Sequence, residues 1–286
     1  MQQENKESSS PDKNPDNAPS ANQDGKAEHN HQAGLPDAGA VAGQIQHEVQ
    51  TARRPWYRVL RQARFLLGVY LIMLALFASL AFWVHVHPVL QIDVAITREF
   101  QENQSPWLRT FMIAVSYLGN TSWLFVGLIA LAVGAFWFFR LRLEAVLIAC
   151  VSLTSSLLNL AVKLLIERPR PTSSLVTILQ HASGKSFPSG HVMSYMAFWG
   201  LLFSLSIMVF KGRSWWRIAL LIISGLFVVL VGPSRIYLGD HWASDVLGAY
   251  LLEGLWLWLW LWLYVQLKAR GVLASSKRSD KASEHG

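Results

Sequence analysis

The sequence contains two histidines whose surroundings suit them to chemistry. The first, His191, lies in the stretch KSFPSGHVMS, residues 185–194, at the start of the apolar segment 191–210. An imidazole changes charge near neutral pH and can donate a proton, accept one or bind a metal. Taken by itself, His191 could therefore be an incidental neighbour of a helix cap, a metal ligand or half of a catalytic pair.

The second histidine, His241, lies in SRIYLGDHWASD, residues 234–245, with Asp245 four residues after it. If the last apolar segment begins here, this spacing places both side chains on one face of a helix. A carboxylate bonded to one ring nitrogen fixes the tautomer and leaves the lone pair of the other nitrogen free, as a nucleophile requires. The same pair could also be a structural hydrogen bond.

Cations accompany both histidines. Lys163 and Arg170 are seven residues apart in KLLIERPRP, residues 163–171, and Arg235 precedes His241 by six. The two prolines of the first stretch favour the end of a helix there. Arginine can grip phosphate oxygens in a bidentate manner and lysine as a point charge. Side chains that merely extend from a membrane to its surface would give the same pattern.

The residues directly before His191 suit an anion. Ser189 has the side chain of an N-cap residue for the helix that follows, and the unpaired N–H groups at a helix start attract anions. Gly190 lets the backbone approach a ligand closely. A simple cap beside an incidental histidine is the alternative interpretation.

Apolar segments must hold these residues in place. The chain is 52% hydrophobic and only 15% charged, whereas soluble proteins are roughly a quarter charged. Most of the apolar segments reach the roughly twenty residues that cross a bilayer, and the predicted spans are 65–84, 120–139, 143–162, 191–210, 217–233 and 246–266. The fifth looks short and is interrupted by Gly225. Residues 106–118 predict a short helix that leads into the second span. The predicted fold class is an all-α, six-transmembrane-helix bundle.

The formal charge of +7 is divided among short clusters between the apolar segments. That pattern indicates membrane orientation rather than nucleic-acid binding. The clusters fall on one side of six spans: Arg53, Arg54, Arg58, Arg61, Arg64, Arg140, Arg142, Lys211, Arg213, Arg217, Lys268 and Arg270. The positive-inside rule makes this side cytoplasmic, with both termini. Basic residues on the other side gather around prolines and histidines, which is typical of a site.

Three ranges describe the predicted domain organisation. Residues 1–50 are polar and contain few large apolar side chains, so we predict a disordered cytoplasmic tail. Residues 51–270 form the six-span domain, and residues 271–286 form a flexible cytoplasmic tail. Cys150 is the single cysteine, which excludes a disulfide framework or a cysteine-rich zinc site.

Taken together, the three polar segments resemble the three-part signature of the type 2 phosphatidic acid phosphatase superfamily, which includes lipid phosphatases, undecaprenyl pyrophosphate phosphatases, glucose-6-phosphatase and vanadium haloperoxidases. The matching residues are Lys163-x6-Arg170-Pro171, Pro188-Ser189-Gly190-His191 and Ser234-Arg235-x5-His241-x3-Asp245. The resemblance covers roughly residues 65–266.

The resemblance implies a role for each matching residue. His241 would attack phosphorus, Asp245 would orient it, and His191 would protonate the leaving oxygen and then activate water. The residues that would hold the phosphate are Lys163, Arg170, Ser189, Gly190 and Arg235. It also implies no metal and no cofactor, and metal ligation by His191 loses its support because no companion ligands stand near it.

The function that follows is hydrolysis of a lipid phosphate or pyrophosphate at the extracytoplasmic face of an inner membrane. The lipid would be of the polyprenyl pyrophosphate, phosphatidic acid or phosphatidylglycerophosphate type. The alternative is a phosphotransferase that passes the phosphoryl group to a lipid acceptor. A haloperoxidase disagrees with six spans, and a transporter or lipid-binding scaffold disagrees with the full set of His191, His241 and Asp245. The sequence makes no statement about oligomeric state.

Some neighbouring polar residues carry weaker predictions. Glu167 and Arg168 are expected to pair with each other, and Asp240 is expected to be a loop carboxylate. Asn159, one turn before the first cation, could line the pocket. An ionisable group inside a span is costly, so Glu253 is predicted to face the cavity.

Overall fold

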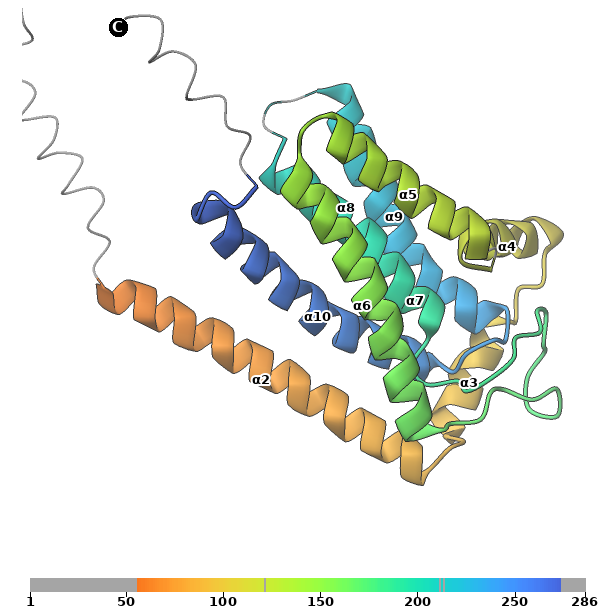
Figure 1. Ribbon diagram of the computed structural model, residues 1–286. Coiled ribbons are helices and arrows are strands. Elements are labelled where there is room, and N and C mark those ends of the chain that lie inside the picture. Colours follow the sequence, from red (N-terminus) through yellow and green to blue (C-terminus); the bar gives the residue numbers. More distant parts are fainter. Residues whose placement is uncertain (1–55, 121, 211, 213, 274–286) are drawn as a thin grey trace, which may run out of the picture. The chain divides into compact units, whose positions relative to one another are not determined.

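Every regular element in the part of the chain that the structure describes is helical. A computed structural model describes residues 56–120, 122–210, 212 and 214–273. The elements are α2 (Trp56–Val86), α3 (Gln91–Phe100), α4 (Pro106–Asn120), α5 (Ser122–Phe138), α6 (Arg142–Ile166), α7 (Gly190–Tyr195), η1 (Met196–Gly200), α8 (Leu201–Met208), α9 (Trp215–Tyr237) and α10 (Ala243–Ala269) (Figure 1). The predicted all-α class is confirmed. The predicted tail over 1–50 lies outside the described residues, as does most of the tail over 271–286.

The chain divides into two units, residues 1–59 and 60–286. Of the first unit, only residues 56–59 are described, and they belong to α2. The second unit contains the rest of α2, all other helices and every residue of the predicted site.

Five helical segments are long and apolar enough to cross a membrane. They are Arg64–Val86, Arg142–Ile166, Gly190–Met208, Trp215–Tyr237 and Ala243–Ala269. The third consists of α7, a π-helical turn and α8 in one continuous segment. The second predicted span corresponds to α5, whose apolar part, Trp123–Phe138, is shorter. A count of six spans therefore stays a prediction. As predicted, α4 leads directly toward α5.

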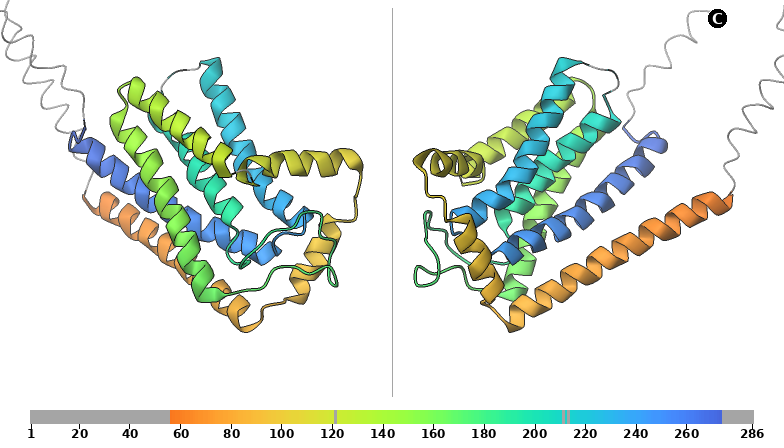
Figure 2. Two further views of the ribbon diagram at one scale, coloured as in Figure 1. Left: turned by 45° about the vertical axis from the view of Figure 1, so that its right-hand side comes forward. Right: turned by 180° about the vertical axis from the view of Figure 1, so that it is seen from behind.

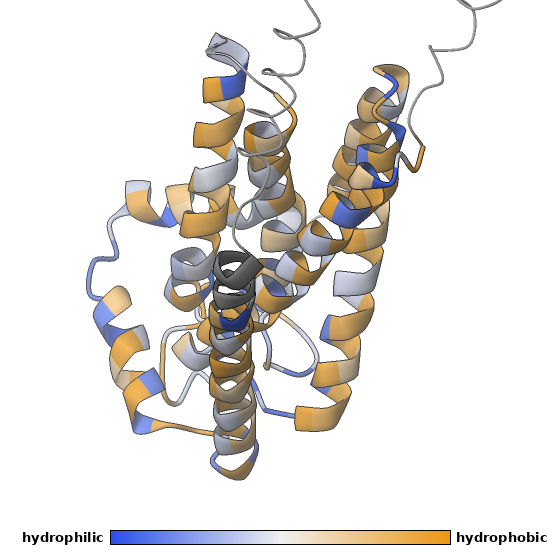
Figure 3. Ribbon diagram, turned by 90° about the vertical axis from the view of Figure 1, so that its left-hand side faces the viewer, coloured by the Kyte–Doolittle hydropathy of each residue, from blue (hydrophilic) through white to orange (hydrophobic). Residues whose placement is uncertain are grey.

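The outer faces of these helices are apolar. Hydrophobic residues follow most of the length of the long helices, and hydrophilic residues gather near their ends and in the connections (Figure 3). Large apolar side chains remain exposed on the second unit, including Phe82, Leu153, Leu165, Val229 and Leu247. Such a surface is costly in water and suits contact with lipid chains.

The fifth predicted span was expected to be short and interrupted at Gly225, and this prediction is wrong. α9 runs for 23 residues and passes through both Gly225 and Pro233. A glycine costs a helix only about 1 kcal/mol. Next to the proline, the Tyr250 hydroxyl of α10 accepts a hydrogen bond from Gly232 N–H and donates one to the Val228 carbonyl, at 3.3 and 2.5 Å. A neighbouring helix thus supports the backbone that proline disturbs.

The helix ends that carry the polar segments meet at one end of the bundle. Figures 1 and 2 show the C-terminal ends of α6 and α9 beside the N-terminal ends of α7 and α10, with α3 next to them. α6 ends at Ile166, and Glu167 follows in the left-handed conformation with φ 54°. The prediction that the chain leaves the helix before Arg170 is confirmed.

A glycine makes the sharp turn that brings His241 to this end. Gly239 has φ +73°, and a Cβ there would lie 2.4 Å from the carbonyl oxygen of Thr177. Both the left-handed conformation and this close approach require glycine. The turn directs the chain from α9 back toward the start of α10.

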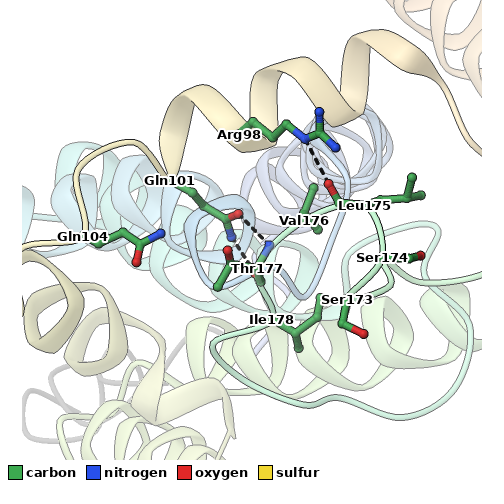
Figure 4. A pocket seen from close by; sticks show the side chains of 9 residues that line it. All are labelled: Arg98, Gln101, Gln104, Ser173, Ser174, Leu175, Val176, Thr177 and Ile178. Atoms are coloured by element: carbon green, nitrogen blue, oxygen red, sulfur yellow. Dashed lines mark hydrogen bonds between the residues drawn. The ribbon is translucent and has the colours of Figure 1, made fainter.

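α3 holds the segment that follows Arg170 (Figure 4). Gln101 Nε2 donates to the carbonyls of Thr177 and Tyr237 at 2.7 and 2.9 Å, and its Oε1 accepts from Thr177 N–H at 3.0 Å. Arg98 Nε donates to the Leu175 carbonyl at 3.0 Å. Arg98, Gln101, Leu175 and Thr177 border a polar cavity of about 580 Å³. α3 therefore ties this connection to the end of α9.

Candidate active site

His241 lies at the centre of a buried polar group of residues. It precedes α10, which begins at Ala243, so the expectation that His241 and Asp245 share a helical face is wrong. The two still meet, with Nδ1 of His241 3.5 Å from Oδ2 of Asp245. The reason is a helix cap: Asp245 Oδ2 accepts the backbone N–H of Trp242 at 2.9 Å, which turns the carboxylate back toward the preceding loop.

Ser186 is a member of this group that sequence reasoning missed. Its hydroxyl donates to Asp245 Oδ2 at 2.5 Å and lies 3.5 Å from His241 Nδ1. It stands five residues before His191 in a stretch singled out for other residues. Only the folded chain shows that it joins the carboxylate to the ring.

Arg168 holds the far side of the Asp245 carboxylate. Its Nη1 donates to Asp245 Oδ1 at 2.6 Å, and its Nη2 pairs with Asp93 at 2.7 Å. The predicted pairing of Glu167 with Arg168 is wrong, because Glu167 instead pairs with Lys185 at 3.0 Å. Consecutive residues at the left-handed end of α6 point in different directions. Asp93 was also missed, since α3 carries no motif.

The two cations of the first polar segment border the site. Arg170 Nη1 lies 3.2 Å from Nε2 of His241 and donates to the Asp240 carbonyl at 2.8 Å. Lys163 Nζ donates to the Lys185 carbonyl at 2.6 Å. The ring nitrogen that faces away from Asp245 therefore faces a cation. That arrangement suits attack by Nε2 on an anionic centre.

Arg235 is fully buried and already paired. Its guanidinium contacts the carboxylate of Asp240 and the hydroxyl of Ser116 on α4. Asp240 lies in the connection between α9 and α10, as predicted for a loop carboxylate, but it is 2% exposed and ion-paired. A buried arginine needs such a partner.

His191 lies at the start of α7, as expected, and is half-buried. Its ring packs against Gly119 of α4, where a Cβ would lie only 2.4 Å from the ring carbon Cδ2. His191 is within electrostatic reach of His241 and of the three cations Lys163, Arg170 and Arg235. The structure thus brings both predicted histidines into one site.

The Ser189–Gly190 turn enters the same site. Ser189 occupies the N-cap position of α7, but its side chain makes no capping hydrogen bond, so that part of the prediction is wrong. Its buried hydroxyl has no hydrogen-bond partner among the described residues. Asn159 lies against Gly190, where a Cβ would come 3.2 Å from Asn159 Oδ1. The turn thus brings an unpaired hydroxyl to the start of α7, and the missing Cβ of Gly190 lets Asn159 pack closely against it.

Glu253 is buried in α10 away from these residues. It accepts a hydrogen bond from the Ser155 hydroxyl of α6 at 2.6 Å. It therefore joins two helices, and among the described residues its hydrogen bond is to Ser155 rather than to a residue of the predicted phosphate site.

Burial keeps the His241 ring neutral. Loss of water lowers the pKa of His241 from 6.5 to about 3, and the charges of Arg170 and Lys163 act in the same direction, while Asp245 opposes them. Burial also lowers the pKa of the Arg170 guanidinium, and Asp245 opposes that shift. A neutral imidazole with a free Nε2 lone pair is the nucleophilic form.

In the part of the chain that the structure describes, no three His, Cys, Asp or Glu side chains are grouped to hold a metal ion. The cations near His241 are the side chains of Arg170 and Lys163.

The long apolar helices are those of a membrane protein. The buried His–Asp pair with cations beside it suits the binding of anionic groups. The chain belongs to the PAP2 superfamily, whose family model matches residues 144–269. It is 35% identical to phosphatidylglycerophosphatase B of Bacillus subtilis (strain 168) over 176 residues, 62% of this chain and 85% of that protein. The family is one of membrane lipid phosphatases.

Two further relatives support this family assignment. Undecaprenyl-diphosphatase BcrC of Bacillus subtilis (strain 168) is 30% identical over 129 residues, 44% of this chain and 60% of that protein. The crystal structure of a transmembrane PAP2-type phosphatidylglycerolphosphate phosphatase from Bacillus subtilis superposes with a TM-score of 0.60 at 31% identity, covering 73% of this chain and 98% of that one. The resemblance of the three polar segments is thereby confirmed at the level of the family.

The buried neutral His241 predicts acid sensitivity. Because its folded pKa of about 3 lies below the ordinary 6.5, the unfolded chain binds a proton that the folded chain does not, so stability falls as the pH drops below 6.5. At pH 5 the loss relative to pH 8 is about 2 kcal/mol. We expect His241→Asn to remove this part of the loss, as measured by chemical unfolding in detergent. Equal losses in both proteins would contradict the assignment.

Proposed function

We propose that this protein hydrolyses the phosphate or pyrophosphate group of a membrane lipid through a phosphohistidine on His241. The observation that carries the proposal is the orientation of that ring. Nδ1 faces Asp245 and Ser186, while Nε2 faces Arg170 at 3.2 Å. The nucleophilic nitrogen is thus the one placed beside a cation that attracts phosphate.

In the first step the Nε2 lone pair attacks phosphorus and the bond to the leaving oxygen breaks. His191 gives its proton to that oxygen. The imidazole of His241 keeps its proton on Nδ1 and becomes a cation, which the Asp245 carboxylate stabilises. In the second step His191 removes a proton from water, the water oxygen attacks phosphorus, and the phosphorus–nitrogen bond breaks.

The phosphate oxygens would be held by Lys163, Arg170 and Arg235. The Ser189 hydroxyl and the N–H groups at the start of α7 would add neutral donors. Each of these groups stabilises charge that grows on the equatorial oxygens during transfer. None of the steps uses a metal ion, so we propose metal-independent catalysis without a cofactor.

The substrate would be an amphiphile whose head group reaches the helix ends while its chains stay in the bilayer. The names of the relatives point to phosphatidylglycerophosphate or a polyprenyl diphosphate as the type, with phosphatidic acid as a third choice. Transfer of the phosphoryl group to a lipid acceptor is the alternative, because it shares the first step. Neither version involves nucleic acid.

Purified protein in detergent tests this proposal. We expect release of inorganic phosphate from a panel of these lipids in the presence of excess EDTA, and a loss of at least about 1,000-fold in His241→Gln. His87→Ala, which changes an exposed histidine outside the site, is the control and should retain activity. Phosphate that appears on a second lipid would favour the transferase, and full activity in His241→Gln would overturn the nucleophile.

The role of His191 as a general acid predicts a dependence on the leaving group. In His191→Ala we expect turnover of poor leaving groups to fall by roughly 100- to 10,000-fold and turnover of acidic phenols to fall much less, because phenolates depart without a proton. Rates over a series of aryl phosphates measure this. A uniform loss across the series would count against proton donation.

The Lys and Arg clusters support a multi-pass inner-membrane protein with both termini cytoplasmic and the site extracytoplasmic. In a Cys150→Ser background, a cysteine at the exposed Lys185 should react with an impermeant maleimide from outside the cell. A cysteine at Arg270, exposed beyond α10, should react only after the membrane is opened. The reverse pattern would overturn this orientation.

A further inference from the structure

A second carboxylate shares the arginine that holds Asp245. Arg168 donates from Nη1 to Asp245 Oδ1 at 2.6 Å and from Nη2 to Asp93 Oδ2 at 2.7 Å. Ser244 adds two contacts, since its N–H donates to Asp93 Oδ1 at 2.9 Å and its hydroxyl to Asp93 Oδ2 at 2.5 Å. All three charged side chains are at most 1% exposed. We call Asp93, Arg168 and Asp245 the carboxylate–arginine cluster.

The cluster carries one more negative than positive charge. Three donors converge on the two oxygens of Asp93, which suits an ionised carboxylate that can only accept. Asp245 likewise accepts from Arg168, Ser186 and Trp242 N–H. One guanidinium therefore faces two carboxylates, and Asp245 is not neutralised by its arginine.

Lys163 and Arg170 lie within electrostatic reach of Asp245, and when His241 becomes a cation the excess negative charge gains a positive partner directly beside it. In the proposed first step the phosphorus–oxygen bond breaks, its electron pair leaves with the oxygen, and the imidazolium forms beside Asp245. The net charge of the cluster and His241 together is then zero. Buried charges interact strongly because little water screens them, and such a fixed arrangement lowers the energy of the state in which the charge develops.

We propose that Asp93 is a positioning residue for phosphoryl transfer: by sharing Arg168 it leaves Asp245 with the net negative charge that stabilises the His241 imidazolium. The proposal rests on the proposed phosphohistidine mechanism. Asp93 does not touch the reacting atoms and acts through Arg168. A purely structural role, in which Asp93 only ties α3 to the start of α10, makes different predictions.

The charged and titratable groups around His241 come from every neighbouring element: Asp93 of α3, Lys163 of α6, Arg168 and Arg170 of the following connection, His191 of α7, Arg235 of α9, Asp240 of the turn and Asp245 of α10. Substitutions within the cluster change only two of these charges, so the others stay constant in the comparison.

The test uses Asp93→Asn and the double variant Asp93→Asn/Arg168→Gln in the full-length protein. Asp93→Asn makes the cluster neutral, and we expect kcat to fall about tenfold with little change in KM. This is less than the 100- to 1,000-fold that loss of a direct donor costs. The double variant restores the net charge of −1, so we expect a higher kcat than in Asp93→Asn despite the additional lost contacts.

The pH profile separates charge from structure. Loss of the Asp93 charge should lower the pKa of His241, and restoration in the double variant should raise it again. Because kcat/KM reports the ionisation of the free enzyme's essential groups, its acid limb should move to lower pH in Asp93→Asn and return in the double variant. Glu144→Gln is the matched control, since Glu144 is a buried carboxylate that pairs with Lys268 in contacts separate from the cluster. It should lower stability without moving the profile.

The outcomes decide between the two proposals. Activity retained in His241→Gln would overturn the phosphohistidine mechanism itself. If His241→Gln is inactive but Asp93→Asn keeps the wild-type kcat and pH profile, only the positioning role fails. A lower kcat in the double variant than in Asp93→Asn would also overturn the positioning role. Loss of contacts, without any effect of charge, predicts that result. If Asp93→Asn and the double variant both fail to fold, Asp93 has a structural role and the positioning role is overturned.

Discussion

The rest of the site depends on the hydrogen bonds and ion pairs of the buried Asp245 carboxylate. It caps α10 by accepting a hydrogen bond from Trp242 N–H. It also accepts hydrogen bonds from the Ser186 hydroxyl and the Arg168 guanidinium, and it faces His241 Nδ1. A buried carboxylate needs several donors, and the partners of this one come from three stretches of the chain, at Arg168, Ser186 and His241–Trp242. Satisfying one charge therefore gathers the connections around the nucleophile.

The helices make this gathering possible. Because α6 and α9 end where α7 and α10 begin, the polar connections lie together while the apolar faces remain available to lipid (Figures 1 and 2). α3 and its C-cap residue contribute twice, since Gln101 holds the segment after Arg170 and Asp93 binds the start of α10. α4 closes another side, through Ser116 on Arg235 and Gly119 on His191.

The sequence identified the residues proposed for the site, but not the residues that hold them in place. His191, His241, Asp245 and the first two cations stand in spaced motifs, and the prolines near Arg170 marked the end of α6. Ser186, Asp93 and the role of Arg168 were not predictable, because their contacts join residues dozens of positions apart and follow no periodicity. The span through Gly225 and Pro233 was missed for a similar reason, since its support from Tyr250 is visible only after folding.

The central claim is that the Nε2 atom of His241 carries the phosphoryl group during turnover. Rapid acid-free quenching with a labelled lipid phosphate, followed by peptide mass spectrometry and treatment with alkali and acid, tests it directly. We expect a phosphoryl group on His241 that survives alkali, is lost in acid and is absent from His241→Gln. Two results would contradict this mechanism. One is labelled phosphate on a residue other than His241 while the wild-type protein turns over, and the other is an equal amount of trapped label in His241→Gln.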